Sequence, residues 1–162
     1  GYNTVSLVNR AAELMRQGDY EQVWCVFDKD DFSDEDFNKA IAIAEAQGMQ
    51  AAYSNQAFEY WIILHFEDHQ GGPMHRSTYA DKLNSYLAHW GESYDEDSKI
   101  ITEEIFALLQ DMDPKSGLVR RDLAIRRARR ILDQLDHRSP AKGESSTIVF
   151  FIGGKYLPKV FI

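Results

Sequence analysis

The chain has 162 residues, of which 44% are hydrophobic, and a formal net charge of −8. This length suits one domain whose core needs no disulfide or structural metal, so we expect residues 1–162 to form a single domain. A lone cysteine, Cys25, cannot form an internal disulfide, and no apolar run approaches the ~20 residues that cross a bilayer. We therefore expect a cytoplasmic protein. The net charge excludes a uniformly basic surface of the kind that coats nucleic acid.

The first elements alternate between helix and strand. Apolar spacing predicts a helix over 5–16. The near-continuous apolar run over 22–27 is typical of a strand buried on both faces, so we expect an interior strand of a parallel sheet. Ser33 is predicted to cap a helix over 34–47, and 49–53 is predicted to be a second strand.

The rest of the chain is mostly helical by the same criteria. Helices are predicted over 57–66, 79–90, 98–109 and 118–135, and one or two strands over 145–162. Ser54 and Asn55, ahead of the first of these helices, read as a polar turn and an N-cap. The strand–helix–strand order at the start predicts an α/β fold, with a mostly parallel sheet flanked by helices and a helical C-terminal half.

An acidic cluster follows the first predicted strand directly. It contains Asp28, Asp30 and Asp31. In parallel α/β sheets, ligands gather outside the carboxyl ends of the strands. Paired carboxylates suit Mg²⁺ or Mn²⁺, which prefer oxygen ligands, so we expect Asp28 and Asp30, two positions apart, to bind such an ion, with Asp31 as an additional ligand or a support for the ligands. The alternative is a solvated acidic loop that caps the next helix.

Two polar residues interrupt the apolar helix predicted over 57–66. Glu59 and His65 would cost free energy on burial unless they are paired or ligating, which makes them candidate functional residues. Because they stand six positions apart, they do not share a helix face and are not expected to bind one ion together. In the alternative, both point outward from a half-buried helix.

Arginines concentrate in the helix predicted over 118–135. Arg126, Arg127 and Arg130 are candidates for contacts with nucleic-acid phosphates. Ordinary pairs on the helix surface with Asp122 and Asp133 explain part of this pattern equally well. A docking face for an acidic partner protein is a third interpretation.

Two separated motifs together resemble one family. The stretch VWCVFDKDDF with the helix after it, followed by SNQAFEYWIILHF, is similar to the RloB-like family, prokaryotic proteins of restriction and abortive-infection defence loci that are often encoded beside an ATPase. The family has a strand ending in Asp-x-Asp-Asp, and then a segment close to S-N-P-C-F-E-L-W-L-L-L-H-F. The resemblance is good over residues 20–66 and looser elsewhere. Gln56, Ala57 and Tyr60 depart from the family pattern.

The resemblance implies a Toprim-type fold, the metal-binding module of topoisomerases, primases and OLD-type nucleases. It then implies a Mg²⁺-dependent nuclease of an anti-phage defence system, which cleaves phosphodiester bonds in DNA or RNA. Asp28 and Asp30 match the Asp-x-Asp of that module, with Asp31 as a further ligand. Glu59 and His65 would assist as acid–base groups or support the ligands.

The chain departs from the family at its start. Toprim proteins also use a glutamate that ends an earlier strand, and RloB-like proteins carry it in a stretch like C-E-G-E-x-T-E, which nothing before Tyr20 resembles. With Gly1 as the first residue, we expect either a fragment of a longer chain or a degenerate member. Two alternatives therefore stay open, a non-catalytic subunit that docks a partner ATPase and a metal-dependent phosphotransferase or primase-like activity on nucleotides.

Overall fold

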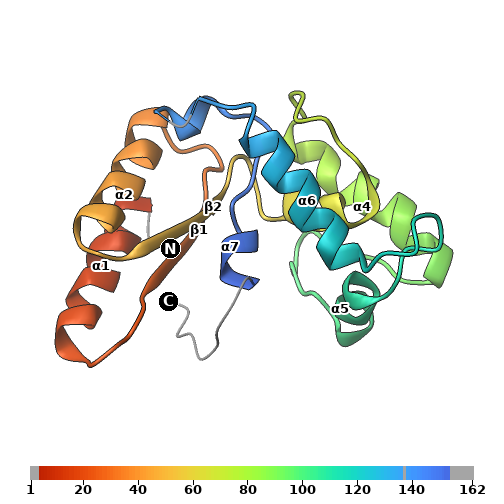
Figure 1. Ribbon diagram of the computed structural model, residues 1–162, viewed down its shortest axis with the longest axis horizontal. Helices are drawn as coiled ribbons and strands as arrows, with labels where there is room; N and C mark the ends of the chain where they lie inside the picture. The colour runs from red at the N-terminus through yellow and green to blue at the C-terminus, as the bar shows by residue number, and fades with distance from the viewer. Residues whose placement is uncertain (1–3, 137, 154–162) are drawn as a thin grey trace.

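The N-terminal half is a strand–helix–strand unit with one helix in front of it. The structure, a computed structural model, describes residues 4–136 and 138–153. The elements of this half are α1 (Thr4–Gln17), β1 (Trp24–Asp28), α2 (Asp34–Ala46) and β2 (Gln50–Ser54). The two strands pair in parallel, with Asp28 opposite Ser54, and α1 and α2 lie side by side next to the sheet (Figure 1).

The second half is helical and lies beside the first (Figure 1). It contains α3 (Glu59–Phe66), the 3₁₀ turn η1 (Arg76–Thr78), α4 (Tyr79–Leu87), the 3₁₀ turn η2 (Ala88–Trp90), α5 (Glu103–Gln110) and α6 (Arg120–Leu132). The chain then returns to the sheet through the 3₁₀ turn η3 (Pro140–Lys142) and ends its described part in α7 (Phe150–Gly153). The expected α/β fold with a helical C-terminal half is confirmed.

Most predicted elements form at their expected places. The side chain of Ser33 accepts a 3.1 Å hydrogen bond from the Asp36 N–H, which is the predicted cap of α2. Gly48 follows that helix with φ 76°, a backbone conformation that glycine adopts without cost. The predicted helix over 98–109 begins later, at Glu103, because the Thr102 side chain caps it by accepting from the Ile105 N–H at 3.2 Å.

Two strand predictions need correction. In the described part of the chain the sheet has two strands, so β1 has β2 as its strand neighbour and is not interior, although Cys25 and Phe27 are buried. Over 145–149 there is a single antiparallel bridge, from Thr147 to Ser54, and 150–153 is helical rather than extended. Phe150 is 2% exposed in the helical half, so tertiary packing overrides its strand propensity. Residues 154–162 of this prediction lie outside the described residues.

Each half has its own hydrophobic cluster. Buried side chains of α1, β1, α2 and β2 form one cluster, and those of α3, α4, α5, α6 and α7 form the other. Ile148 packs against both clusters, so the returning segment joins the two halves. Within the described ranges, no helix is both long and apolar enough to cross a membrane.

Candidate functional site

The loops that follow the two strands lie against each other. The Lys29 N–H donates to the Ser54 carbonyl at 3.0 Å, and the Asp30 N–H donates to the Gln56 carbonyl at 2.9 Å. Asp30 and Gln56 both adopt positive φ, 46° and 85°. This conformation is uncommon for residues other than glycine and concentrates at functional sites. The parallel register therefore brings the acidic cluster and the SNQAFE segment together at the carboxyl end of the sheet.

The polar residues of the second loop hold the returning chain. Asn55, which is fully buried, donates to the carbonyls of Pro140 and Ala141 at 2.9 and 2.8 Å. Gln56 donates to the Glu144 carboxylate at 2.9 Å. The predicted N-cap is wrong, because Phe58 precedes α3 and no side chain caps that helix. The amide N–H groups of Asn55 instead donate to carbonyls of η3.

Asp28 lies close to two other carboxylates. Its own burial raises its pKa to about 7, and the negative charges of Asp30 and Glu59 act in the same direction. A hydrogen bond from the Phe58 N–H and the positive charge of Lys99 oppose this shift. The structure thus gathers the ends of both motifs into one acidic neighbourhood.

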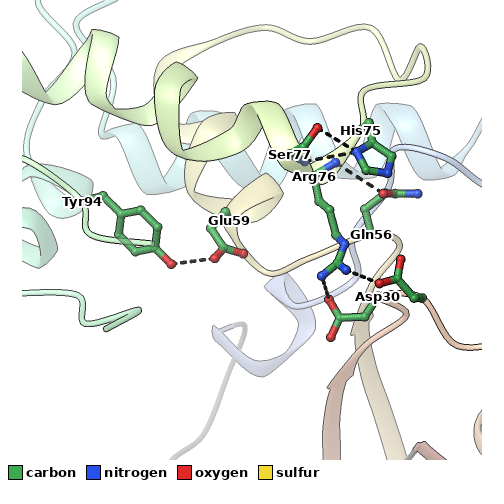
Figure 2. Close-up of polar contacts among 8 residues, drawn as sticks. Asp30, Gln56, Glu59, His75, Arg76, Ser77 and Tyr94 are labelled. Atoms are coloured by element: carbon green, nitrogen blue, oxygen red, sulfur yellow. Dashed lines mark hydrogen bonds and ion pairs between the residues drawn. The ribbon is translucent and has the colours of Figure 1, made fainter. Parts of the chain in front are cut away.

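Glu59 is oriented by a tyrosine from the helical half. It begins α3 and is 8% exposed, and its Oε1 accepts a 2.6 Å hydrogen bond from the Tyr94 hydroxyl (Figure 2). Asn84 fixes the backbone of Tyr94 with two hydrogen bonds, 2.7 Å to its N–H and 3.0 Å to its carbonyl. Burial and the charge of Glu59 raise the pKa of Tyr94 well above its usual value, so its hydroxyl remains a donor.

An arginine meets the remaining acids. The Arg76 guanidinium donates to Asp30 Oδ1 at 2.9 Å (Figure 2). It also forms an ion pair with Asp31. A cleft of about 320 Å³ lies between η1 and the loop before α5, and Glu59, Arg76 and Lys99 are among its lining residues. The site therefore consists of an acidic loop, in which Arg76 pairs with two of the acids, and a cleft that Arg76 and Glu59 also line.

The carboxylate oxygens of this site are the kind of ligand that Mg²⁺ prefers, but their positions match a metal site only in part. Carboxylates with water completing the shell are what Mg²⁺ and Mn²⁺ take, and Asp28 and Glu59 are close neighbours that no cation pairs with in the described part of the chain. Among the residues that the structure describes, however, no three His, Cys, Asp or Glu side chains gather as a preformed metal cage. Asp30 and Asp31 hold Arg76, so they could join a metal shell only after that pairing opens.

His65 lies apart from the carboxylates. Its ring contacts Trp61, whose carbonyl is 3.0 Å from Nδ1, and it lines an apolar cavity of about 560 Å³ between α3, α5 and α7. Burial lowers its pKa to about 4, so the imidazole is neutral at pH 7. The structure does not bring His65 together with Asp28 or Glu59.

The three predicted nucleic-acid contacts have different surroundings on α6. Arg126 is exposed, with no hydrogen bond or ion pair to another described residue. Arg127 donates to the Leu64 carbonyl at 2.7 Å, and Arg130 forms an ion pair with Asp68. Two of the three guanidinium groups therefore hold the end of α3 and the loop after it.

Sequence reasoning missed Arg76 and Tyr94. Each lies in a loop-rich stretch whose pattern carries no motif. Arg76 reaches Asp30 only because the helical half folds back onto the strand ends, and Tyr94 reaches Glu59 across 35 positions of the chain within the helical half. One arginine and one tyrosine, each outside any motif, do not indicate in the sequence which distant carboxylate they contact.

The match to a family model decides the relationship of this chain to known proteins. The model of the RloB-like protein family matches residues 1–152. The chain belongs to the RloB-like family. No curated protein and no solved structure gives a significant match.

Proposed function

We propose that this RloB-like chain is a Toprim-like nuclease that depends on Mg²⁺ or Mn²⁺, cleaves phosphodiester bonds in DNA or RNA, and acts in cytoplasmic anti-phage defence. The observation that carries the proposal is the convergence of Asp28, Asp30 and Glu59 at the carboxyl end of the parallel sheet, beside a cleft of about 320 Å³. Family membership supports the same class of activity.

The carboxylates have different roles in this proposal. Asp28 and Glu59 would hold the ion, with Asp30 and Asp31 joining them when Arg76 leaves. A divalent ion bound there would polarise a phosphoryl oxygen and lower the pKa of a bound water. Tyr94 would keep Glu59 oriented toward the site through its 2.6 Å hydrogen bond. His65 lines the apolar cavity rather than the cleft and would stabilise α3 instead.

The test is a cleavage assay with matched variants. Labelled single-stranded DNA, duplex DNA and RNA are incubated with the protein in Mg²⁺, in Mn²⁺ and in EDTA. We expect cleavage of at least one substrate with metal and none in EDTA. Asp28→Asn and Glu59→Gln should each lower the rate by about 100-fold or more, since each removes a ligand of the reacting centre.

Glu104→Gln is the control for the loss of one negative charge. Glu104 is exposed on α5, where it lines no part of the cleft. Its variant should keep the activity of the unmodified protein. Cleavage that survives in both Asp28→Asn and Glu59→Gln would contradict the proposed site.

A second function is favoured by one specific observation. Arg76 neutralises Asp30 and Asp31 within the chain. Such ion pairs are expected where the acids stabilise a loop rather than bind a metal. The chain would then be a non-catalytic subunit that docks a partner ATPase. Absence of cleavage on all three substrates, together with stoichiometric binding of a purified ATPase from the same defence locus, would support this alternative.

A further inference from the structure

His65 is a buried imidazole that the proposed chemistry does not use. It lies near the end of α3 and is 2% exposed. Its Nδ1 is 3.0 Å from the Trp61 carbonyl, and a carbonyl oxygen can only accept a hydrogen bond. Because burial lowers its pKa to about 4, the ring is neutral at pH 7 and carries one proton. That proton is therefore on Nδ1, and Nε2 is a hydrogen-bond acceptor.

This acceptor has no donor among the described residues. The carbonyls of Trp61 and Ile62 interact with the ring from the preceding turn of α3, on the side where Nδ1 lies. The Trp61 ring contacts the imidazole edge to face, with 4.8 Å between the ring centroids, and offers no hydrogen bond in that contact. Nε2 thus lies at the far end of a buried ring without a partner. Such an acceptor lowers the stability of a protein unless something donates to it.

The imidazole lines a cavity of ligand size. The cavity has a volume of about 560 Å³, within the range of about 300–1,000 Å³ that is typical of pockets for small molecules. Helices α3, α5, α6 and α7 supply most of its walls, and α7 lies between the sheet and the helical half (Figure 1). Phe106 is 58% exposed and belongs to the lining, so the cavity reaches solvent.

The rest of the lining indicates which chemistry fits. Apart from His65, all the lining side chains except Gln110 and Arg121 are apolar. These two are bonded to each other, because Arg121 Nη1 donates to Gln110 Oε1 at 3.3 Å, and Arg121 also forms an ion pair with Asp122. A charged ligand would therefore leave water without gaining an unpaired opposite charge, which costs free energy. An uncharged apolar ligand with one hydrogen-bond donor matches this lining.

We propose that this cavity binds an uncharged, mostly apolar small molecule whose hydroxyl group donates a hydrogen bond to Nε2 of His65. The apolar walls would supply the affinity, and the single buried acceptor would select for the hydroxyl. The site requires no metal and none of the carboxylates, so it does not depend on the proposed nuclease activity. Its ligand would contact α3, the helix that begins with Glu59.

The experiment compares two probes that differ in one donor. 2-Naphthol carries a hydroxyl group, whereas 2-methoxynaphthalene has the same rings and cannot donate. Both fluoresce, so the anisotropy of their emission measures their binding to the whole chain. The ratio of the two affinities, naphthol over methoxynaphthalene, should be about fivefold higher in the unmodified protein than in His65→Phe, which is the scale of one neutral hydrogen bond. His89→Phe is the matched control, because His89 is exposed in η2, and it should leave the ratio unchanged.

Two further measurements locate the probes. Ile125 lines the cavity from α6 and does not contact the acidic loop, so Ile125→Trp should fill the space and weaken both probes by about tenfold or more. In the unmodified protein, 2-naphthol should shift the ¹⁵N resonance of His65 Nε2 and 2-methoxynaphthalene should leave it in place. This resonance tests the hydrogen bond without any variant, and so it decides the matter if His65→Phe does not fold.

Each contrary outcome would overturn the proposal. An equal affinity ratio in the unmodified protein and His65→Phe would mean that the hydroxyl does not meet the imidazole and that a water molecule satisfies Nε2. Unchanged affinities in a folded Ile125→Trp would place the probes outside the cavity. Absence of binding of both probes to the folded chain would show that another part of the chain, or a second copy of it, occupies the space.

Discussion

The Tyr94 hydroxyl donates a 2.6 Å hydrogen bond to Oε1 of Glu59, and both side chains are buried. Glu59 begins α3, directly after the strand unit, whereas Tyr94 lies 35 residues further along the chain. The contact therefore ties the loop before α5 to the start of α3, within the helical half. It also gives a buried carboxylate the partner that its burial requires.

Removal of this hydroxyl should destabilise the protein. Tyr94→Phe deletes a hydrogen bond to a charged group, which contributes about 1.5–3 kcal/mol to the free energy of unfolding. Urea unfolding monitored by circular dichroism measures the change. Tyr20→Phe is the control, because Tyr20 is 44% exposed, and it should change the free energy of unfolding by less than about 0.5 kcal/mol. Similar values for the two variants would show that the Tyr94 bond is not made in solution.

Asp28 should make stability fall as the pH rises. Burial, with the neighbouring acids, raises its folded-state pKa to about 7, above the value of about 3.9 in an unfolded chain. The folded state therefore holds the proton more tightly. This contribution is complete below pH ~4 and is lost as the pH rises through ~7, to a maximum of about 4 kcal/mol.

Asp28→Asn isolates that contribution. In EDTA, the free energy of unfolding of Asp28→Asn minus that of the unmodified protein should increase steadily from pH 4 to pH 7, because only the unmodified protein loses the contribution of Asp28. Asp19→Asn, at an exposed position after α1, should leave the pH profile unchanged. A constant difference between Asp28→Asn and the unmodified protein across this range would contradict the raised pKa.

His65 should contribute with the opposite sign. Burial lowers its folded-state pKa to about 4, below about 6.5 for the unfolded chain, so the unfolded state binds the proton first. The stability that His65 provides is present above pH ~6.5 and is lost as the pH falls toward 4. His65→Phe, which keeps a ring beside Trp61, should lose less stability on acidification than the unmodified protein.

Unfolding curves at a series of pH values measure this effect. His89→Gln is the control, because His89 is exposed in η2 and has no such burial. Acid sensitivity that is equal in His65→Phe and the unmodified protein would mean that the imidazole titrates normally in the folded state.

The arginines of α6 should separate into a structural and an exposed group. Arg127→Gln removes the 2.7 Å bond to the Leu64 carbonyl and should cost about 1.5–3 kcal/mol of stability, whereas Arg126→Gln should cost less than about 0.5 kcal/mol. If α6 contacts nucleic acid, Arg126→Gln should lower the salt dependence of binding by about one counter-ion. Fluorescence anisotropy against salt concentration measures this slope. An unchanged slope would remove Arg126 from the interface.

The local elements of the N-terminal half follow from the sequence alone. Each of these elements is specified by features that lie within a few residues of it. These are the apolar run before Asp28, the cap at Ser33 and the helix stop at Gly48, so composition and spacing determine β1, α2 and β2. A strand followed by acids also places Asp28 at the carboxyl end of the sheet. The resemblance to the RloB-like family over residues 20–66 rests on the same stretch, and the family match confirms it.

Only the tertiary structure decided the partners of these residues. Arg76 meets Asp30 across 46 positions of the chain, and Tyr94 meets Glu59 across 35. Phe150 joins a helical cluster rather than a strand. None of these contacts has a local signature, because each joins residues far apart in the sequence and depends on how the chain folds back on itself. The sequence thus located the acidic end of the sheet, while packing between the halves determined its counter-ions and separated His65 from it.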